Sequence, residues 1–149
     1  MIKTIKFNNI EDKVIPIKKG LGAKNEIHSM PKNWCSDYVT TKQKDIQGYE
    51  NVEIITLDDY VKENNLQVGL IKVDIEGAEQ NFLKGAEQTI KTQKPSLLIS
   101  IYHNAADFFE IKPMIESWNL GYKFRIVKHM NGHPSVDTLL VAEVPEEAG

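Results

Sequence analysis

The segment LIKVDIEGAE, residues 70–79, constrains the fold of this chain more than any other. It opens with a short apolar run rich in β-branched residues, which is typical of a buried strand. Asp74 and Glu76 follow, then Gly77, and a helical pattern begins at once. Open α/β sheets carry their reactive groups at the carboxyl ends of strands, so this junction is a candidate site. The alternative is that Glu76 and Glu79 only favour a helix N-terminus through its dipole.

The next segments continue the alternation of strand and helix. Apolar residues at helical spacing predict a helix over 77–92, and the run LLISIY at 97–102 predicts a second buried strand. A strand–helix–strand unit of this length indicates parallel neighbouring strands. His103 follows the second strand, so we expect it beside Asp74 and Glu76, where a carboxylate can orient an imidazole as a general base. A hydrogen-bonded histidine at a strand end, without a catalytic role, is the alternative.

The C-terminal third predicts one helix and an antiparallel hairpin. Apolar residues at helical spacing favour a helix over 107–118, with Pro113 either in the first turn of a shorter helix or at a kink in a longer one. Strand-like segments at 122–127 and 138–144 are separated by a turn signal and predict the hairpin. The fold class is therefore α/β, with a parallel central unit and a C-terminal antiparallel pair.

The N-terminal part has a weaker pattern. Residues 23–47 are interpreted as an irregular hairpin inserted into the domain, because they carry scattered large apolar side chains without regular spacing. Gly20 and Gly22 follow a short apolar run, but the spacing of a phosphate-binding loop is absent. We expect strands at 14–17, 25–30, 37–41 and 52–57, and a helix at 58–64 capped by Asp58 or Asp59.

Composition narrows the possible partners. The chain has 149 residues, which fits one domain spanning 1–149, and 18 basic against 21 acidic residues give a net charge of −3. This balance gives no reason to expect a nucleic acid or an anionic membrane as partner. The single cysteine, Cys35, excludes an internal disulfide, and no zinc-ligand spacing occurs, so no metal is predicted. Without a long apolar run or a signal peptide, a cytoplasmic protein is expected.

Four segments resemble the FkbM family of methyltransferases: TLDDYVKENN, GLIKVDIEGAEQNFLKGA, KPSLLISIYHNAADFFEIKPMIESWNLGYKF and DTLLVAE. The similarity covers about residues 45–144 and, more loosely, 8–22, and KVDIEGAE is its most distinctive part. The resemblance implies a Rossmann-like methyltransferase sheet, S-adenosylmethionine as cofactor, and methylation of a hydroxyl of a sugar, a polyketide or another small molecule.

The resemblance also implies roles for individual residues. Asp74 and Glu76 would face the cofactor's methyl group and the acceptor, with His103 nearby as base. Gly22 and Asp74 would be the cofactor-binding residues in this chain. Holding two reactants in place accounts for much of the rate of such transfers.

The sequence lacks the segments with which the family pattern begins. The family begins with a strand, a glycine-containing cofactor loop and a second strand that ends in a ribose-binding acid, and no such segments precede Met1 here. The resemblance therefore implies a truncated domain, the C-terminal part of the methyltransferase fold with a partial sheet. It leaves the edge at 70–73 unpaired, so we expect this edge to form a homodimer or to be covered by another strand.

Three functional hypotheses follow. The first is an FkbM-type O-methyltransferase that uses S-adenosylmethionine and a small-molecule acceptor. The alternative is a non-catalytic α/β binding or assembly domain derived from a methyltransferase, since these 149 residues lack the main cofactor motif. A third is a hydrolase that uses Asp74, Glu76 and a metal ion.

Overall fold

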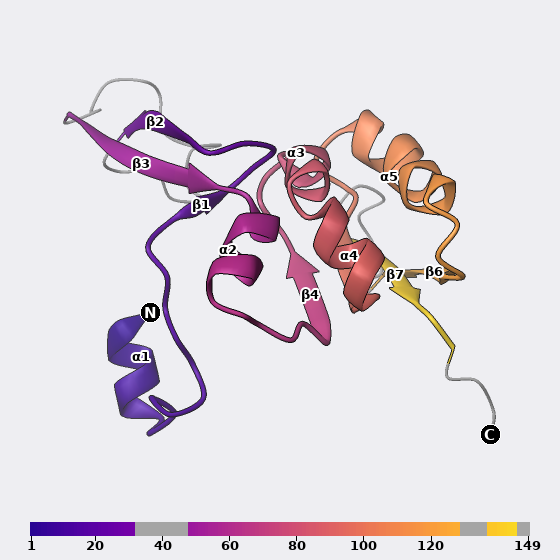
Figure 1. Ribbon diagram of the computed structural model, residues 1–149. Coiled ribbons are helices and arrows are strands. Elements are labelled where there is room, and N and C mark those ends of the chain that lie inside the picture. Colours follow the sequence, from indigo (N-terminus) through magenta and orange to yellow (C-terminus); the bar gives the residue numbers. More distant parts are fainter. Residues whose placement is uncertain (32–47, 129–136, 146–149) are drawn as a thin grey trace. The chain divides into compact units, whose positions relative to one another are not determined.

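The computed structural model describes residues 1–31, 48–128 and 137–145. The chain divides into two compact units, Met1–Gly20 with Ile27–Glu53 and Leu21–Glu26 with Ile54–Gly149, and the expectation that it folds as a single domain stays a prediction. Its elements (Figure 1) are, in chain order, α1 (Ile2–Phe7), β1 (Gly20–Leu21), β2 (Glu26–Pro31), β3 (Tyr49–Ile55), α2 (Leu57–Glu63), β4 (Leu70–Val73), α3 (Glu79–Lys84), α4 (Glu87–Gln93), β5 (Ser96–Ser100), α5 (Ala105–Ser117), β6 (Lys123–Lys128) and β7 (Thr138–Glu143).

The first unit begins with the short helix α1, which buries Ile5. The strand expected at 14–17 is wrong, because residues 14–19 have no regular secondary structure and β1 begins only at Gly20. Pro16 has no N–H to donate to a strand ladder, and Ile15 is 80% exposed, so neither hydrogen bonding nor burial favours a strand here. Lys19 instead forms an ion pair with Glu53, with 2.8 Å between Nζ and Oε1.

The strands β1, β3 and β2 form a three-stranded sheet in that order. The strand expected at 25–30 is confirmed as β2, and the one expected at 52–57 is confirmed as β3 but starts earlier, at Tyr49. The strand expected at 37–41 and most of the 23–47 insertion lie outside the described residues.

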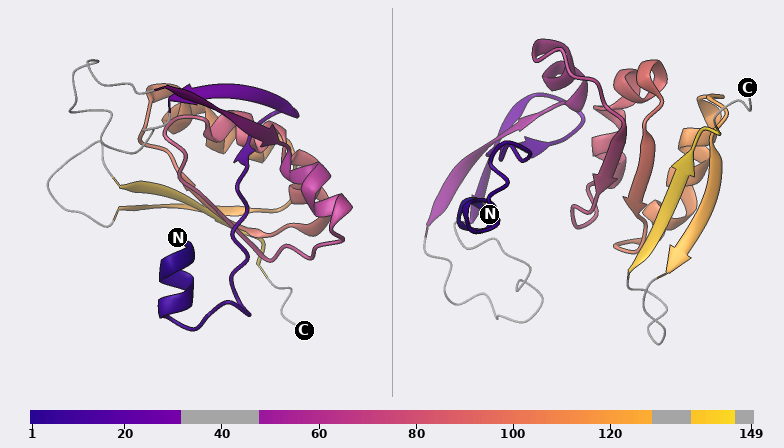
Figure 2. Two further views of the ribbon diagram at one scale, coloured as in Figure 1. Left: turned by 90° about the vertical axis from the view of Figure 1, so that its left-hand side faces the viewer. Right: turned by 90° about the horizontal axis from the view of Figure 1, so that it is seen from below.

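The second unit is built on a four-stranded sheet in the order β4-β5-β7-β6 (Figure 2). Strands β4 and β5 are parallel, with Leu70 opposite Ser96 and Val73 opposite Ile99, so the predicted parallel unit is confirmed. Strand β7 is antiparallel to both β5 and β6, which confirms the predicted hairpin. β4 forms one edge of this sheet and β6 forms the other.

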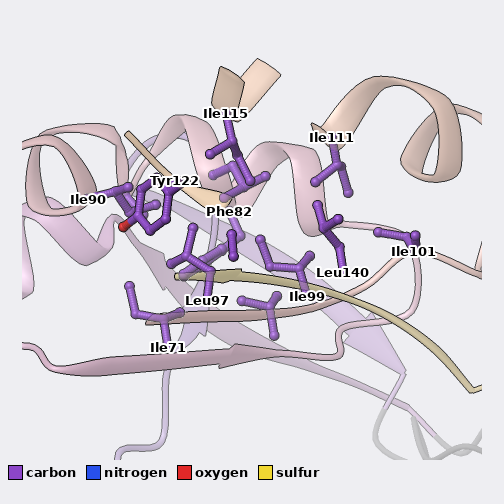
Figure 3. Close-up of a cluster of buried hydrophobic side chains, with 14 residues drawn as sticks. Ile71, Phe82, Ile90, Leu97, Ile99, Ile101, Ile111, Ile115, Tyr122 and Leu140 are labelled. Carbon is purple, nitrogen blue, oxygen red and sulfur yellow. The ribbon is translucent and has the colours of Figure 1, made fainter. Parts of the chain in front are cut away.

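Helices α3, α4 and α5 cover one face of this sheet and enclose the main hydrophobic core (Figure 3). On β4, Ile71 and Val73 are buried while Leu70 and Lys72 are exposed, which is the alternation of a strand with one covered face. The core consists of Ile71, Val73, Phe82, Leu83, Ala86, Ile90, Leu97, Ile99, Ile101, Ile111, Ile115, Tyr122, Leu140 and Ala142.

The helix expected over 77–92 is interrupted. It consists of α3 and α4, which are separated at Gly85 and Ala86. A Cβ atom at Gly85 would lie 2.0 Å from the carbonyl oxygen of Gly22, so the backbones of these two glycines pack directly against each other. This approach requires glycine at position 85 and coincides with the break.

The expected cap of α2 is wrong. Thr56 caps this helix by accepting a hydrogen bond from the Asp59 N–H at 3.0 Å. Asp58 instead accepts from the backbone N–H groups of Gln88 and Thr89, at 3.0 and 2.7 Å, and so satisfies the first turn of α4. The carboxylate therefore links two helices that are distant in the sequence.

Helix α5 is the longer of the two alternatives for the segment around Pro113. It extends from Ala105 to Ser117 with Pro113 inside, and Asn104 caps it by accepting from the Asp107 N–H at 2.8 Å. No helix in the described part of the chain combines the length and the apolarity that crossing a bilayer requires.

Candidate functional site

The carboxyl ends of β4 and β5 bring the predicted polar residues together. Asp74 follows β4 directly, and His103 lies three residues beyond the end of β5. His103 Nε2 is 3.5 Å from Asp74 Oδ1 and 3.5 Å from Glu76 Oε2. The imidazole is 9% exposed, whereas the side chains of Asp74 and Glu76 are 38% and 67% exposed. A buried base thus lies beside two carboxylates that reach solvent.

A tight turn after β4 directs these carboxylates. Glu76 has a φ of 58° and Gly77 a φ of 98°, so two consecutive residues adopt left-handed conformations. For a residue other than glycine this conformation costs roughly 1–2 kcal/mol. Gly77 also packs closely, because a Cβ there would lie 3.2 Å from Asn104 Nδ2. The turn reverses the chain at once and starts α3 beside the end of β5.

Glu79 is the member of this cluster that the sequence did not predict as functional. It is fully buried, its Oε1 accepts from the Ile75 N–H at 2.9 Å, and the same oxygen lies 2.9 Å from His103 Nδ1. The sequence does contain a pattern that indicates the burial of Glu79. Glu79 falls on the apolar stripe of its helix, three and four residues before Phe82 and Leu83, where a charged side chain has to be buried.

Three buried polar atoms of this cluster have no hydrogen-bond partner among the described residues. They are Glu79 Oε2 and both ring nitrogens of His103. The close approach of His103 Nδ1 to Glu79 does not have the alignment of a hydrogen bond, so the distance alone does not satisfy either group. Buried polar atoms in folded proteins are nearly always paired, and each exception calls for an explanation.

Tyr102 lies beside His103 and contacts Asp74. Its hydroxyl donates to Asp74 Oδ1 at 3.3 Å, and its ring centroid is 4.2 Å from that of His103. Burial, followed by the negative charge of Asp74, raises the pKa of the Tyr102 hydroxyl. The hydroxyl therefore stays protonated and remains a donor. Lys72 approaches the other oxygen of Asp74 at 3.5 Å.

A second polar group supports the cluster from the start of α5. Asp107 is 1% exposed and accepts from Asn104 Nδ2 at 2.6 Å and from Gln80 Nε2 at 3.3 Å. Burial raises the pKa of Asp107, and the nearby charge of Glu79 raises it further, while the hydrogen bond from Gln80 acts in the opposite direction. Asn104 therefore joins the helix cap to the loop that carries His103.

A cavity of about 270 Å³ lies beside Tyr102 and Asn104, the two chain neighbours of His103, but no side chain of the cluster itself lines it. Phe108 and Phe109 line it from α5 with an edge-to-face ring contact at 5.2 Å, and Tyr102 and Asn104 line it from the loop. Pockets for drug-sized ligands occupy roughly 300–1,000 Å³, so this space suits a small molecule or one sugar ring.

Gly22, the other residue expected to bind cofactor, lies in a different environment. Its N–H donates to the Ile55 carbonyl at 3.0 Å, and a Cβ at this position would lie 2.8 Å from Ile54 Cγ2. Together with its contact to Gly85, this close packing is sufficient reason for glycine at position 22. Its predicted role toward a cofactor stays a prediction.

A sequence model of the FkbM methyltransferase domain matches residues 7–124, which is more than half of the chain. The chain belongs to the FkbM methyltransferase family. A crystal structure of methyltransferase FkbM from Methylobacillus flagellatus KT, at 2.20 Å resolution, is similar in fold, with a TM-score of 0.69 and 23% identity. The match covers 95% of this chain and 31% of the chain in that crystal structure. A comparison with curated proteins gave no match.

These findings confirm the family and the α/β fold class that the sequence predicts. The chain spans about a third of the length of that crystallised protein, and membership of the FkbM family suggests methyl transfer as its chemistry. The segment KVDIEGAE, which is the most distinctive part of the resemblance, forms the end of β4 and the left-handed turn described above.

Proposed function

We propose that this chain takes part in the transfer of a methyl group from S-adenosylmethionine to a hydroxyl oxygen of a sugar or another small molecule. The observation that carries the proposal is the position of His103, with Nε2 at 3.5 Å from both Asp74 and Glu76. A hydroxyl is a weak nucleophile at neutral pH, so its proton has to leave as the oxygen attacks. A histidine beside two carboxylates suits that task.

In this proposal His103 accepts the proton of the acceptor hydroxyl. The carboxylates of Asp74 and Glu76, each 3.5 Å from Nε2, lie where they can orient the imidazole and balance the charge that it gains. Tyr102 keeps Asp74 in place through its hydroxyl. The acceptor approaches the cluster from the solvent side, where Asp74 and Glu76 are exposed.

The acidic cluster is chemically compatible with the positive charge on the sulfur of S-adenosylmethionine. When bound, the cofactor supplies a methyl group that the acceptor oxygen attacks, and its sulfur leaves as a neutral thioether. Asp74 and Gly22 are the residues of this chain that we assign to cofactor binding, and both belong to the second compact unit.

Calorimetric titration of the protein with S-adenosylmethionine tests the cofactor, and transfer of labelled methyl groups to a panel of sugars tests the reaction. We expect binding, and transfer that His103→Gln lowers by about 10²–10⁴-fold, the range of general-base catalysis. Glu63→Gln, an exposed acid on α2, is the matched control and should transfer methyl groups at the wild-type rate. No binding at millimolar cofactor would refute the proposal for this chain.

A non-catalytic binding or assembly domain is the second candidate. The observation that favours it is the outer edge of β4, where Leu70 is 60% exposed at the end of a parallel pair. Such an edge can accept a strand from a second copy of the chain. A stable dimer that binds no cofactor would support this candidate over the enzyme.

A further inference from the structure

We propose that Asp74, Glu79 and His103 form a binding site for a divalent metal ion. The first argument is the set of unpaired buried atoms: Glu79 is fully buried, the His103 side chain is 9% exposed, and Glu79 Oε2 and both imidazole nitrogens have no hydrogen-bond partner in the part of the chain that the structure describes. A buried carboxylate oxygen without a partner is unfavourable. A cation bound between these residues would take a lone pair from Glu79 and one from a single imidazole nitrogen, so His103 acts as a base only while the ion is absent.

The distances support one cation rather than separate contacts. Each of the three residues offers one ligand atom, and these atoms all lie within 4.8 Å of one another. A first-row metal ion lies about 2.1 Å from each nitrogen or oxygen ligand, so its ligands are about 3.0 Å apart when adjacent and about 4.2 Å apart when opposite. Closing the site therefore requires a movement of at most about 2 Å.

Asp74 is the side chain that can make this movement. It is 38% exposed, and its contacts with Tyr102 and Lys72, at 3.3 and 3.5 Å, are long. Glu79 and His103 are fixed by burial and by the hydrogen bond from the Ile75 N–H. The two buried ligands therefore form a rigid half of the site, and Asp74 completes it from the solvent side. The exposed position of Asp74 leaves room for water or another oxygen ligand on the ion.

The ligand set indicates which kind of ion would bind. Two carboxylates neutralise a divalent charge, and carboxylate oxygens favour Mg²⁺ and Mn²⁺, whereas an imidazole favours first-row transition metals. Mn²⁺ satisfies both preferences and tolerates six ligands, so we choose it as the probe. The left-handed turn at Glu76 and Gly77 contributes indirectly, because it brings α3, and Glu79 with it, to the end of β5.

A buried ion pair between Glu79 and a protonated His103 is the competing explanation of the same distances. The two explanations differ in one observable quantity. An ion pair predicts no specific Mn²⁺ binding, whereas the metal site binds Mn²⁺ and loses a ligand when the Asp74 carboxylate is removed.

Electron paramagnetic resonance of Mn²⁺ provides the test, since the signal of free Mn²⁺ decreases as the ion binds. The full chain is titrated with Mn²⁺ alone, without cofactor or acceptor, so the result is independent of the proposed methyl transfer. We expect one binding site, with affinity at least about 10-fold lower in Asp74→Asn and in Glu79→Gln, because even residues that only support metal ligands change affinity by 10–100-fold. Glu63→Gln is the matched control and should bind as the wild type does.

Circular dichroism of each variant shows whether it is folded. If Glu79→Gln does not fold, Asp74→Asn decides the question, because Asp74 is partly exposed and lies outside the hydrophobic core. No Mn²⁺ binding by the wild type, or equal binding by the wild type and folded Asp74→Asn, would overturn the proposal.

Discussion

The contact between Gly85 and Gly22 predicts a large effect for one added methyl group. An ideal Cβ at Gly85 lies 2.0 Å from the Gly22 carbonyl oxygen and 3.0 Å from its carbon, whereas ordinary contacts begin at 3.4 Å. The two backbone segments would have to separate by about 1.4 Å. Overpacking of this kind costs about 1–3 kcal/mol, and because Gly85 has an ordinary φ of −85°, the effect is steric.

Gly85→Ala also lowers the conformational entropy of the unfolded chain, and this effect by itself stabilises a protein by about 0.4–1 kcal/mol. We therefore expect a net loss of about 1.3 kcal/mol in the free energy of unfolding. With a urea dependence of about 2 kcal/mol per molar, the midpoint followed by circular dichroism should fall by about 0.7 M.

Gly69→Ala is the matched control for this experiment. No atom lies within 4 Å of a Cβ at Gly69, and its φ is not in the left-handed region. Its urea midpoint should equal or slightly exceed that of the wild type. If Gly85→Ala and Gly69→Ala unfold at the same urea concentration, the two glycine backbones are not in contact and the explanation of the helix break is incorrect.

Three further predictions concern the site and the sheet edge. Asn104→Ala removes the cap of α5 and should lower the free energy of unfolding by about 1 kcal/mol in urea titrations, and an unchanged midpoint would contradict the cap. Burial raises the pKa of Asp107 in the folded protein above its ordinary value of 3.8. The stability that the protonated Asp107 contributes is therefore complete below pH 3.8 and is lost as the pH rises through the higher pKa of the folded state. Asp107→Asn should therefore lose less stability than the wild type as pH rises above about 4 in thermal unfolding, and parallel pH profiles would refute this. Leu70→Asp should convert the expected dimer into a monomer in light scattering, and a wild-type monomer at high concentration would argue against pairing through β4.

The parallel strands and the meeting of Asp74, Glu76 and His103 could be predicted because they follow from local patterns. Two dense β-branched runs separated by a helix-length segment allow only a parallel crossover, and the parallel direction brings the residues after both runs to one edge. The hairpin of β6 and β7 was predictable for a similar reason, since a turn signal separates two short strands.

The features that the sequence did not predict depend on contacts between distant segments. The break between α3 and α4 lies where Gly85 packs against Gly22, which is more than sixty residues earlier in the chain. Asp58 similarly caps a helix that begins about thirty residues further along the chain. Glu79 was assigned to the helix dipole because acids are common in a first helical turn. Its burial follows from the packing of α3 on the sheet, and the sequence alone does not show which face of the helix packs there.

The left-handed backbone at Glu76 has a consequence for how this sequence can change. Glycine or asparagine would adopt that backbone more easily, so a stability screen should enrich Glu76→Gly or Glu76→Asn. The native glutamate is then a residue that the backbone conformation does not favour, and its carboxylate lies 3.5 Å from His103. Stability and activity would therefore select for different residues at position 76, and comparing the two selections would measure how much of this turn serves the fold and how much serves the reaction.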